Sequence, residues 1–189
     1  SEDVEKLSLF HDELITFNKK YNLISKSTEL VMWDRHILDS AQIVDYIGFE
    51  DGFSVSDMGS GAGFPGIVLS IFNKNSKFHV KLYEKSKVKI KFLRAVCEKL
   101  NIKANIYEND YANHNINSKY IVSRAFKKLD EHIKISREII QVRHKLIILK
   151  GKNAKMEIKN LSKKLNYSYV LKESITSPGS KIIRLEIKK

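Results

Sequence analysis

The chain has 189 residues, with 34 Lys and Arg against 22 Asp and Glu, which gives a formal net charge of +12. At about 100–200 residues per domain this length fits one domain, and its 42 % hydrophobic residues are enough for a packed core. No apolar run approaches the ~18 residues that span a bilayer, and the acidic start is unlike a signal peptide. Cys97 is the only cysteine, which excludes an internal disulfide and a cysteine-cluster zinc site. We therefore expect a cytoplasmic protein without metal and without membrane attachment.

The apolar spacing within residues 1–50 predicts a helical extension. The first helix has one apolar face at spacings of three and four, formed by Leu7, Phe10, Leu14, Phe17 and Tyr21. A second helix is expected from about Glu29 to Ile47, where Gly48 would end it. Its apolar stripe would consist of Leu30, Trp33, Ile37, Ala41, Val44 and Ile47.

Polar residues of this second helix could also have a role. On a regular helix His36 and Ser40 share a face with Trp33, whereas Arg35 and Asp39 form an (i, i+4) pair on another face. Taken alone, these residues favour a core histidine and an ordinary helix ion pair.

From residue 51 to residue 189 short β-rich segments alternate with helical ones, which predicts one compact α/β unit with a parallel sheet. The expected strands are Phe53–Met58, Lys77–Tyr83, Ala104–Tyr107, Tyr120–Val122, Leu146–Leu149, Ser168–Lys172 and Lys181–Ile187. The expected helices are Phe64–Phe72, Lys85–Leu100, Lys128–Gln141 and Asn153–Leu165. Only a turn at residues 177–180 separates the last two strands, so they should pair antiparallel. The prediction is a Rossmann-like, mostly parallel seven-stranded sheet with a terminal antiparallel hairpin.

A glycine-rich loop follows the first of these strands, in the sequence Asp57-Met58-Gly59-Ser60-Gly61-Ala62-Gly63-Phe64-Pro65-Gly66. Glycines let the backbone turn sharply and let a ligand approach, and the following helix start suits an anionic group. The spacing from Gly61 to Gly66 matches the dinucleotide fingerprint, and the spacing from Asp57 to Gly63 matches the loop of S-adenosylmethionine-dependent methyltransferases. In both classes an acid after the second strand binds ribose, and Glu84 stands there.

Three features favour S-adenosylmethionine as the cofactor: Asp57 at the strand end, the antiparallel last hairpin, and a third strand that ends near Asp110. Asp110, or its neighbours Tyr111 and Ala112, would then meet the adenine.

The ends of the fourth and fifth strands, at Arg124 and Lys150, would face the methyl acceptor. The chain lacks the Asn/Asp-Pro-Pro-Tyr/Phe clamp of amino-methylating enzymes, and Cys97 lies within a helix, where a core position is expected. An acceptor that needs neither device is a ring nitrogen with a free lone pair, such as guanine N7. Arg124 or Lys150 could donate to guanine O6 or to a phosphate. An equally good interpretation is that each is an ordinary surface charge.

The positive charge is concentrated after residue 60. Residues 1–60 carry five basic and twelve acidic side chains, whereas the remaining 129 residues carry 29 basic and 10 acidic ones. A basic body of this kind favours a polyanionic partner such as nucleic acid.

Several motifs in this order resemble the RsmG family, also called GidB: residues 18–23 (Asn-Lys-Lys-Tyr-Asn-Leu), 35–40 (Arg-His-Ile-Leu-Asp-Ser), 57–66, 123–126 (Ser-Arg-Ala-Phe) and 149–151 (Leu-Lys-Gly). The resemblance runs from about Phe17 to Gly151. It implies a class I S-adenosylmethionine-dependent methyltransferase with an N-terminal helical extension. Its substrate would be N7 of one guanine, expected to be guanine 527, in the 16S rRNA of the small ribosomal subunit.

The resemblance also implies roles for individual residues. Gly59 and Phe64 would border the cofactor, Glu84 its ribose, and Tyr111 and Ala112 its adenine. Arg124 would lie between the cofactor and the acceptor. Arg35, His36 and Asp39 would organise the edge of the pocket, with their helix packed over the glycine loop. The expected site therefore comprises Arg35, His36, Arg124 and Lys150 for catalysis and Asp57, Gly59, Gly61, Gly63, Phe64, Glu84, Asp110, Tyr111, Ala112 and Arg124 for the cofactor.

Two other functions remain open from the sequence. A nicotinamide-dependent oxidoreductase would account for the spacing of Gly61, Gly63 and Gly66, and an RNA-binding module with a vestigial loop would account for the charge. A monomer is expected.

Overall fold

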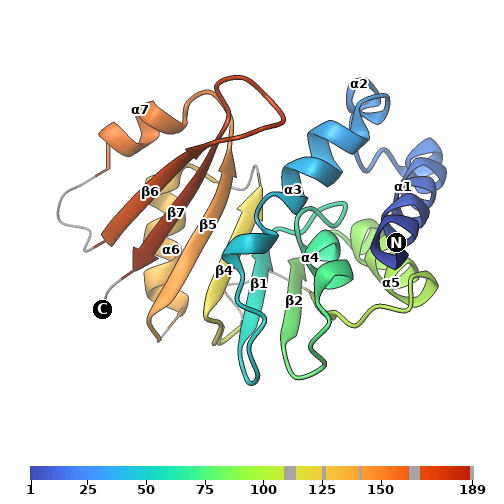
Figure 1. The fold of residues 1–189 in the computed structure, drawn as a ribbon, viewed down its shortest axis with the longest axis horizontal. Helices are drawn as coiled ribbons and strands as arrows, with labels where there is room; N and C mark the ends of the chain where they lie inside the picture. The colour runs from blue at the N-terminus through green and yellow to red at the C-terminus, as the bar shows by residue number, and fades with distance from the viewer. Residues whose placement is uncertain (109–113, 125–126, 141, 162–166, 188–189) are drawn as a thin grey trace.

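The computed structural model describes residues 1–108, 114–124, 127–140, 142–161 and 167–187. Its centre is a seven-stranded sheet in the order β3-β2-β1-β4-β5-β7-β6 (Figure 1). The first five strands pair in parallel, and β7 is antiparallel to both β5 and β6. The strands are β1 (Ser54–Met58), β2 (His79–Glu84), β3 (Asn105–Glu108), β4 (Tyr120–Arg124), β5 (His144–Lys150), β6 (Tyr167–Glu173) and β7 (Lys181–Ile187).

Each strand expected from the sequence is present, and the last has the predicted bounds. The parallel order and the antiparallel hairpin are confirmed, because the alternation of strands and helices fixed the direction of each strand. The carboxyl ends of β1, β2, β4 and β5 consequently meet at one edge of the sheet. At this edge lie Met58, Glu84, Arg124 and Lys150.

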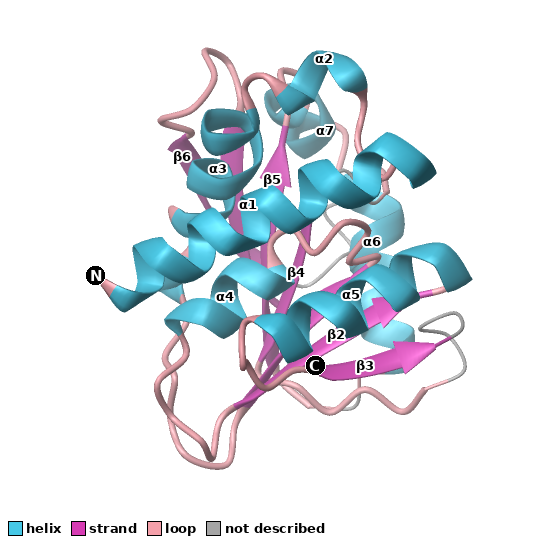
Figure 2. Ribbon diagram, turned by 90° about the vertical axis from the view of Figure 1, so that its right-hand side faces the viewer, coloured by secondary structure: helices cyan, strands magenta, loops and turns pink. Residues whose placement is uncertain are grey.

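Helices cover both faces of the sheet. Figure 2 shows α4 and α5 on one face with α1 lying across them, and Figure 1 shows α6 on the other face. The helices are α1 (Glu2–Tyr21), α2 (Lys26–Glu29), α3 (Asp39–Ala41), α4 (Gly66–Phe72), α5 (Lys87–Lys99), α6 (Leu129–Ile139) and α7 (Ala154–Lys159). In the part of the chain described, no helix is long and apolar enough to cross a bilayer.

The predicted second helix, Glu29 to Ile47, is wrong as a single α-helix. Helix α2 ends at Glu29, and the segment after it consists of a π-helical turn (Trp33–Leu38), α3 and a 3₁₀ turn (Val44–Tyr46). A π-helical turn inserts an additional residue and rotates the side chains that follow. The predicted apolar stripe is wrong at its start, before the rotation acts: Leu30 is 94 % exposed and Trp33 is 41 % exposed, whereas His36 and Ile37 are buried.

The extension shares its core with the sheet. Phe10 of α1 is fully buried, 5.0 Å from the Phe64 ring of the glycine loop and 6.3 Å from Phe92 of α5 (centroid distances). Leu7 and Leu14 belong to the same cluster of buried side chains. A helix that was expected to bury an apolar face does so directly over the loop that follows β1.

Candidate functional site

The glycine loop lies between β1 and α4, at the carboxyl edge of the sheet. The backbone N–H groups of Gly59 and Ser60 both donate to the carbonyl of Tyr83 at 3.0 Å, which fastens the loop to β2. Gly59, Gly61 and Gly63 have φ values of 73°, 59° and 95°. These values lie in the left-handed region that side chains with a Cβ disfavour, so the backbone path itself selects glycine.

The glycines of the loop serve two different purposes. A Cβ added at Gly61 would meet only the carbonyl oxygen of Gly59, at 3.8 Å, so that the space in front of Gly61 is open. A Cβ at Gly63 would stand 2.5 Å from the side chain of Ile67, and one at Gly66 2.2 Å from that of Leu82. Gly61 therefore leaves room for a ligand, whereas Gly63 and Gly66 let the loop and α4 pack closely.

Asp57 is buried completely beneath this loop. Its Oδ2 accepts the N–H of Gly66 at 2.9 Å, while its Oδ1 has no partner among the described residues. Burial raises the pKa of Asp57 to about 7 despite that hydrogen bond. The side chain was expected at the cofactor, and the structure places it where it fixes the start of α4.

Glu84, at the end of β2, faces the loop from the other side. Its Oε2 accepts the N–H of Gly61 at 2.9 Å, and its Oε1 accepts the N–H groups of Lys85 and Ser86 at 2.9 and 2.8 Å. The carboxylate is 8 % exposed. It thus stands directly beside the open space at Gly61, as a ribose-binding acid would.

The π-helical turn covers the loop from outside the sheet. The His36 ring stacks on Phe64 with a centroid distance of 4.9 Å and an angle of 19°. The expected packing of this segment over the glycine loop is present. Burial, together with the positive charges of Arg124 and Arg35, lowers the pKa of His36 to about 3, so the ring is neutral at physiological pH.

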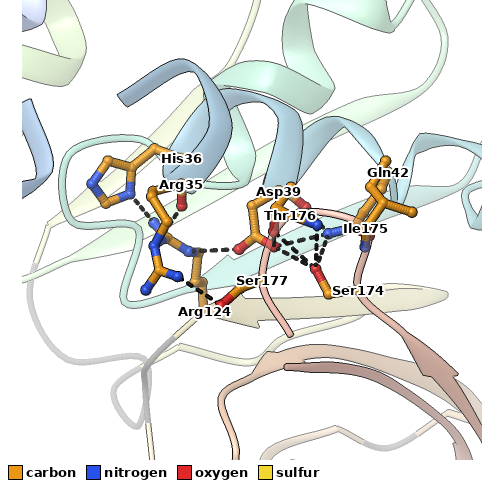
Figure 3. A network of polar contacts seen from close by, with 9 residues as sticks. All are labelled: Arg35, His36, Asp39, Gln42, Arg124, Ser174, Ile175, Thr176 and Ser177. Atoms are coloured by element: carbon orange, nitrogen blue, oxygen red, sulfur yellow. Dashed lines mark hydrogen bonds and ion pairs between the residues drawn. The ribbon is translucent and has the colours of Figure 1, made fainter. Parts of the chain in front are cut away.

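Arg124, at the end of β4, is the centre of a polar network (Figure 3). Its guanidinium donates to Nδ1 of His36, to Oδ2 of Asp39 at 3.1 Å and to the carbonyl oxygen of Arg35 at 2.6 Å. Arginine has no acceptor, so Nδ1 of the neutral His36 accepts and its hydrogen is on Nε2. Burial lowers the pKa of Arg124, and Asp39 opposes that shift. The guanidinium carbon also lies 6.0 Å from the centroid of the Phe64 ring.

Asp39 extends the network to the turn between β6 and β7. Its Oδ1 accepts hydrogen bonds from Thr176 Oγ1 at 2.7 Å, Ser174 Oγ at 3.2 Å and Gln42 Nε2 at 2.8 Å. The expected pair between Arg35 and Asp39 is wrong, since Asp39 pairs with Arg124 instead. The π-helical turn between them changes the spacing on which an (i, i+4) pair depends.

A hollow of about 220 Å³ adjoins this network and is lined by Arg35, Arg124, Lys150, Ser177, Ser180 and Lys181 among others. A larger hollow of about 700 Å³ lies at the opposite edge of the sheet, beside Phe78, Ala104 and Asn105. Ligands of open α/β sheets bind at the carboxyl ends of strands, so the smaller hollow is the one that belongs to the site.

Comparison with known proteins identifies the family of this chain. The family model described as rRNA small subunit methyltransferase G matches residues 3–185. The chain belongs to the GidB family. The ribosomal RNA small subunit methyltransferase G of Rickettsia prowazekii is 36 % identical over 185 residues, which cover 98 % of this chain and 94 % of that protein. The protein of the same name from Pelagibacter ubique is 35 % identical over 190 residues, covering 98 % and 89 %.

Solved structures confirm the fold of this GidB chain. A SAM dependent methyltransferase from Aquifex aeolicus superposes with a TM-score of 0.65 at 13 % identity, covering 91 % of this chain and 98 % of that one. The O-methyltransferase from Bacillus cereus, solved in complex with SAH, gives 0.64 at 12 % identity and covers 95 % and 90 %. The expected class I, Rossmann-like methyltransferase fold is confirmed.

Lys150 is engaged differently from what the sequence suggested. Its ammonium donates to the carbonyl oxygen of Lys127 at 2.6 Å and lies 3.1 and 2.8 Å from the two carboxylate oxygens of Glu157 in α7. Glu157 also accepts the N–H of Leu129, the first residue of α6. Through its hydrogen bonds to Lys127 and Glu157 and its ion pair with Glu157, Lys150 joins α6, α7 and β5 in this conformation.

Other expected site residues fall outside the described part of the chain. The structure does not describe residues 109–113, which include Asp110, Tyr111 and Ala112. It also does not describe residues 125–126, the last two of the motif at 123–126. Their assignment to the adenine and to the acceptor site stays a prediction.

Sequence reasoning missed the turn between β6 and β7 as part of the site. Ser174, Thr176 and Ser177 all bond to residues of the extension, more than 130 positions earlier in the chain. The signal in the sequence is the density of hydroxyls in Ser174-Ile175-Thr176-Ser177-Pro178-Gly179-Ser180, of which residues 177–180 predict only a turn.

Proposed function

We propose that this GidB chain transfers the methyl group of S-adenosylmethionine to N7 of a guanine in 16S rRNA, with guanine 527 the expected position. The observation that carries the proposal is the family match over residues 3–185 on a chain whose glycine loop keeps its ligand face open at Gly61. The named relatives act on ribosomal RNA of the small subunit, and the basic body of this chain fits such a polyanion. A ribosomal RNA substrate would set the place of action as the cytoplasm.

The residues at the loop fit S-adenosylmethionine. A Cβ would fill the open space at Gly61, and Glu84 borders it with a carboxylate, the group that binds ribose hydroxyls in such sheets. Glu84 would exchange its contact with the Gly61 N–H, at least in part, for those hydroxyls. Asp57 would act through the loop, because its side chain has no exposed surface.

The chemistry asks little of the protein beyond positioning. S-adenosylmethionine, when bound, supplies a methyl group on a positively charged sulfur. A lone pair in line with the carbon–sulfur bond can accept this methyl group. Guanine N7 carries no proton, so no general base is needed. Cys97 is no candidate nucleophile, since it lies within α5 and burial raises the pKa of its thiol to about 11. Holding two reactants in line can account for about 7–11 kcal/mol of a barrier.

Arg124 is the residue proposed to orient the acceptor. Three fixed contacts hold its guanidinium beside Phe64 of the glycine loop. A guanidinium in that place can donate to guanine O6, which lies on the same edge of the base as N7. His36, stacked on Phe64 and accepting from Arg124, would fix the position of both side chains.

The proposal is tested with purified protein, S-adenosylmethionine and 16S rRNA that lacks the modification. Calorimetry measures cofactor binding, and mass spectrometry of the RNA locates the methyl group. Binding of reduced nicotinamide cofactor in place of S-adenosylmethionine would support the oxidoreductase alternative. RNA binding without methyl transfer, unaffected by Glu84→Ala, would support the non-catalytic RNA-binding alternative.

A glycine pair tests the cofactor site itself. Gly61→Val should abolish S-adenosylmethionine binding and leave RNA affinity largely intact, because the branched side chain fills the open space but removes no positive charge. Gly52→Val is the matched control: Gly52 also has a left-handed φ of 75° and open space around it, but it lies away from the loop. Both variants bear a similar backbone strain of about 1–2 kcal/mol, so only a direct role in binding would separate their cofactor affinities.

A further inference from the structure

The hollow beside Arg124 has four cationic side chains in its lining, and three of them are paired with a carboxylate. The pairs are Arg124 with Asp39, Lys150 with Glu157, and Lys181 with Glu173. Arg35 is the exception: among the described residues, no carboxylate oxygen lies within 4 Å of its guanidinium. The positive charge that the hollow can offer to a ligand is therefore concentrated at Arg35.

Arg35 is held in place by two contacts from different parts of the fold. Its carbonyl oxygen accepts from Arg124, which fixes the main chain, and its Nη1 donates to Ser177 Oγ at 2.8 Å (Figure 3). Ser177 accepts in this bond, and among the described residues its own hydroxyl hydrogen makes no hydrogen bond. The pair thus presents the remaining guanidinium hydrogens and one hydroxyl hydrogen at the same place.

This donor set suits a phosphate group. A guanidinium presents a planar fork of N–H groups that matches two phosphate oxygens, and charge-assisted bonds of this kind are short and strong. The described residues that line the hollow come from residues 35–39, the ends of β4 and β5, and the turn between β6 and β7, and none of them belongs to the glycine loop. This placement favours an anion of the RNA over the carboxylate of S-adenosylmethionine.

We propose that Arg35 and Ser177 together bind one phosphate of the RNA backbone next to the target guanine. The inference rests on the proposed function for the presence of RNA and adds the residues that grip it. Arg124 borders both the Phe64 side and the hollow, so the base and the phosphate lie on its two sides. Arg35 and Ser177, which we call the phosphate clamp, join the extension to the last hairpin, and RNA binding would tighten that junction.

The test is the salt dependence of equilibrium RNA binding, measured without cofactor for wild type, Arg35→Ala, Arg35→Lys and Ser177→Ala. One phosphate contact contributes about 0.7–0.9 to the slope of log K against log salt, so Arg35→Ala should flatten the slope by that amount. The same relation corresponds to a loss of about four- to sixfold in affinity at 0.15 M salt. Arg35→Lys should keep the slope and lose affinity because it lacks the fork, and Ser177→Ala should lose affinity at an unchanged slope.

Two controls exclude a general loss of stability or of positive charge as the cause of weaker RNA binding. Arg35→Ala keeps the carbonyl that Arg124 binds, so its melting temperature should match that of wild type. Arg143→Ala removes an arginine that precedes β5 at the opposite edge, where it pairs with Glu186 at 2.8 Å, and should leave the slope unchanged. In turnover assays Arg35→Ala should raise KM for RNA by a larger factor than it lowers kcat, and the affinity for S-adenosylmethionine should stay as in wild type.

Three outcomes bear on the clamp and on the proposed function separately. An unchanged slope in Arg35→Ala would overturn the clamp. So would a loss of S-adenosylmethionine affinity in Arg35→Ala with unchanged affinity for methylthioadenosine, because the anion would then be the cofactor's carboxylate. A wild-type protein that binds RNA but transfers no methyl group would overturn the proposed function, while the salt slopes would still decide on the clamp.

Discussion

Asp57 shows how much a single buried side chain can contribute to this site. Its carboxyl group has no exposed surface, one oxygen accepts the N–H of Gly66, and burial raises its pKa to about 7. A buried carboxylate without full hydrogen bonding is costly in the charged form, so the proton is retained well above the usual pKa of aspartic acid. The residue that anchors the loop is therefore sensitive to pH near neutrality.

Asp57→Asn tests this property through the pH dependence of stability. Because the folded-state pKa lies above the unfolded-state value, the folded chain holds the proton more tightly, and stability falls as pH rises from about 4 to about 7. One such proton gives a slope of up to ~1.4 kcal/mol per pH unit. We expect the free energy of unfolding, measured in urea, to fall less steeply in the variant over that range.

The comparison must be made as a difference between the two proteins. Burial also lowers the pKa values of His36 and His132 to about 3, and these groups lose stability as pH falls, in the opposite sense. Both histidines are present in wild type and variant, so their contribution cancels. Identical slopes in the two proteins would show that Asp57 is ionised across the range.

At the scale of elements, the site depends on a junction between segments that are far apart in sequence. The π-helical turn and α3 meet the turn between β6 and β7 through Asp39, while Arg124 connects both to β4. Asp39 accepts from Arg124 with one oxygen and from Ser174, Thr176 and Gln42 with the other (Figure 3). A charged acceptor with four donors fixes the relative position of three elements.

Asp39→Asn removes the charge and keeps the shape. Hydrogen bonds to charged groups contribute about 1.5–3 kcal/mol, and Arg124 would keep a buried charge without its partner, so a loss of about that size is expected in urea unfolding. Hydrogen exchange at residues 174–177 should accelerate, and methyl transfer should fall. Asp51→Asn serves as control, since it removes an exposed pair with Lys77 and should change stability by less than ~0.5 kcal/mol. Equal effects of the two substitutions would contradict a role for Asp39 at this junction.

At the scale of the whole molecule, the extension and the sheet share buried side chains, from which we predict that they unfold together. Phe10 is fully buried between α1, α4 and α5 and contacts both Phe64 and Phe92. Residues 1–50 were expected as an extension ahead of a compact unit at 51–189. The shared core predicts that the second part alone would expose the apolar surface beneath α1.

Phe10→Ala should therefore lower the free energy of unfolding by about 3–5 kcal/mol, the usual range for a fully buried phenylalanine. Leu9→Ala, on the exposed side of the same helix, should have a much smaller effect because Leu9 is 41 % exposed. The intact chain should unfold in a single transition by fluorescence and by circular dichroism. Two separate transitions, or cooperative unfolding of residues 51–189 alone, would show that the two parts are independent.

The strand order and the glycine loop could be predicted from the sequence because both depend on local patterns. The alternation of strands and helices constrains chain direction, and left-handed backbone at Gly59, Gly61 and Gly63 is available to glycine almost alone. The irregular segment from Glu29 to Ile47 was predicted less well. Its apolar spacing fits one helix, but polar contacts with Arg124 and with the last hairpin favour a π-helical turn instead.

The sequence by itself determined the class of fold, the loop and the acid Glu84 beside it, because each follows from residues that are neighbours in the chain or stand at the ends of adjacent strands. Only the tertiary structure decided which charges remain available. It paired Arg124 with Asp39, 85 positions away, engaged Lys150 with Glu157, and left Arg35 with a hydroxyl partner. A net charge of +12 gives the sum of the charges, whereas the availability of each one depends on the partners that folding brings within hydrogen-bond distance.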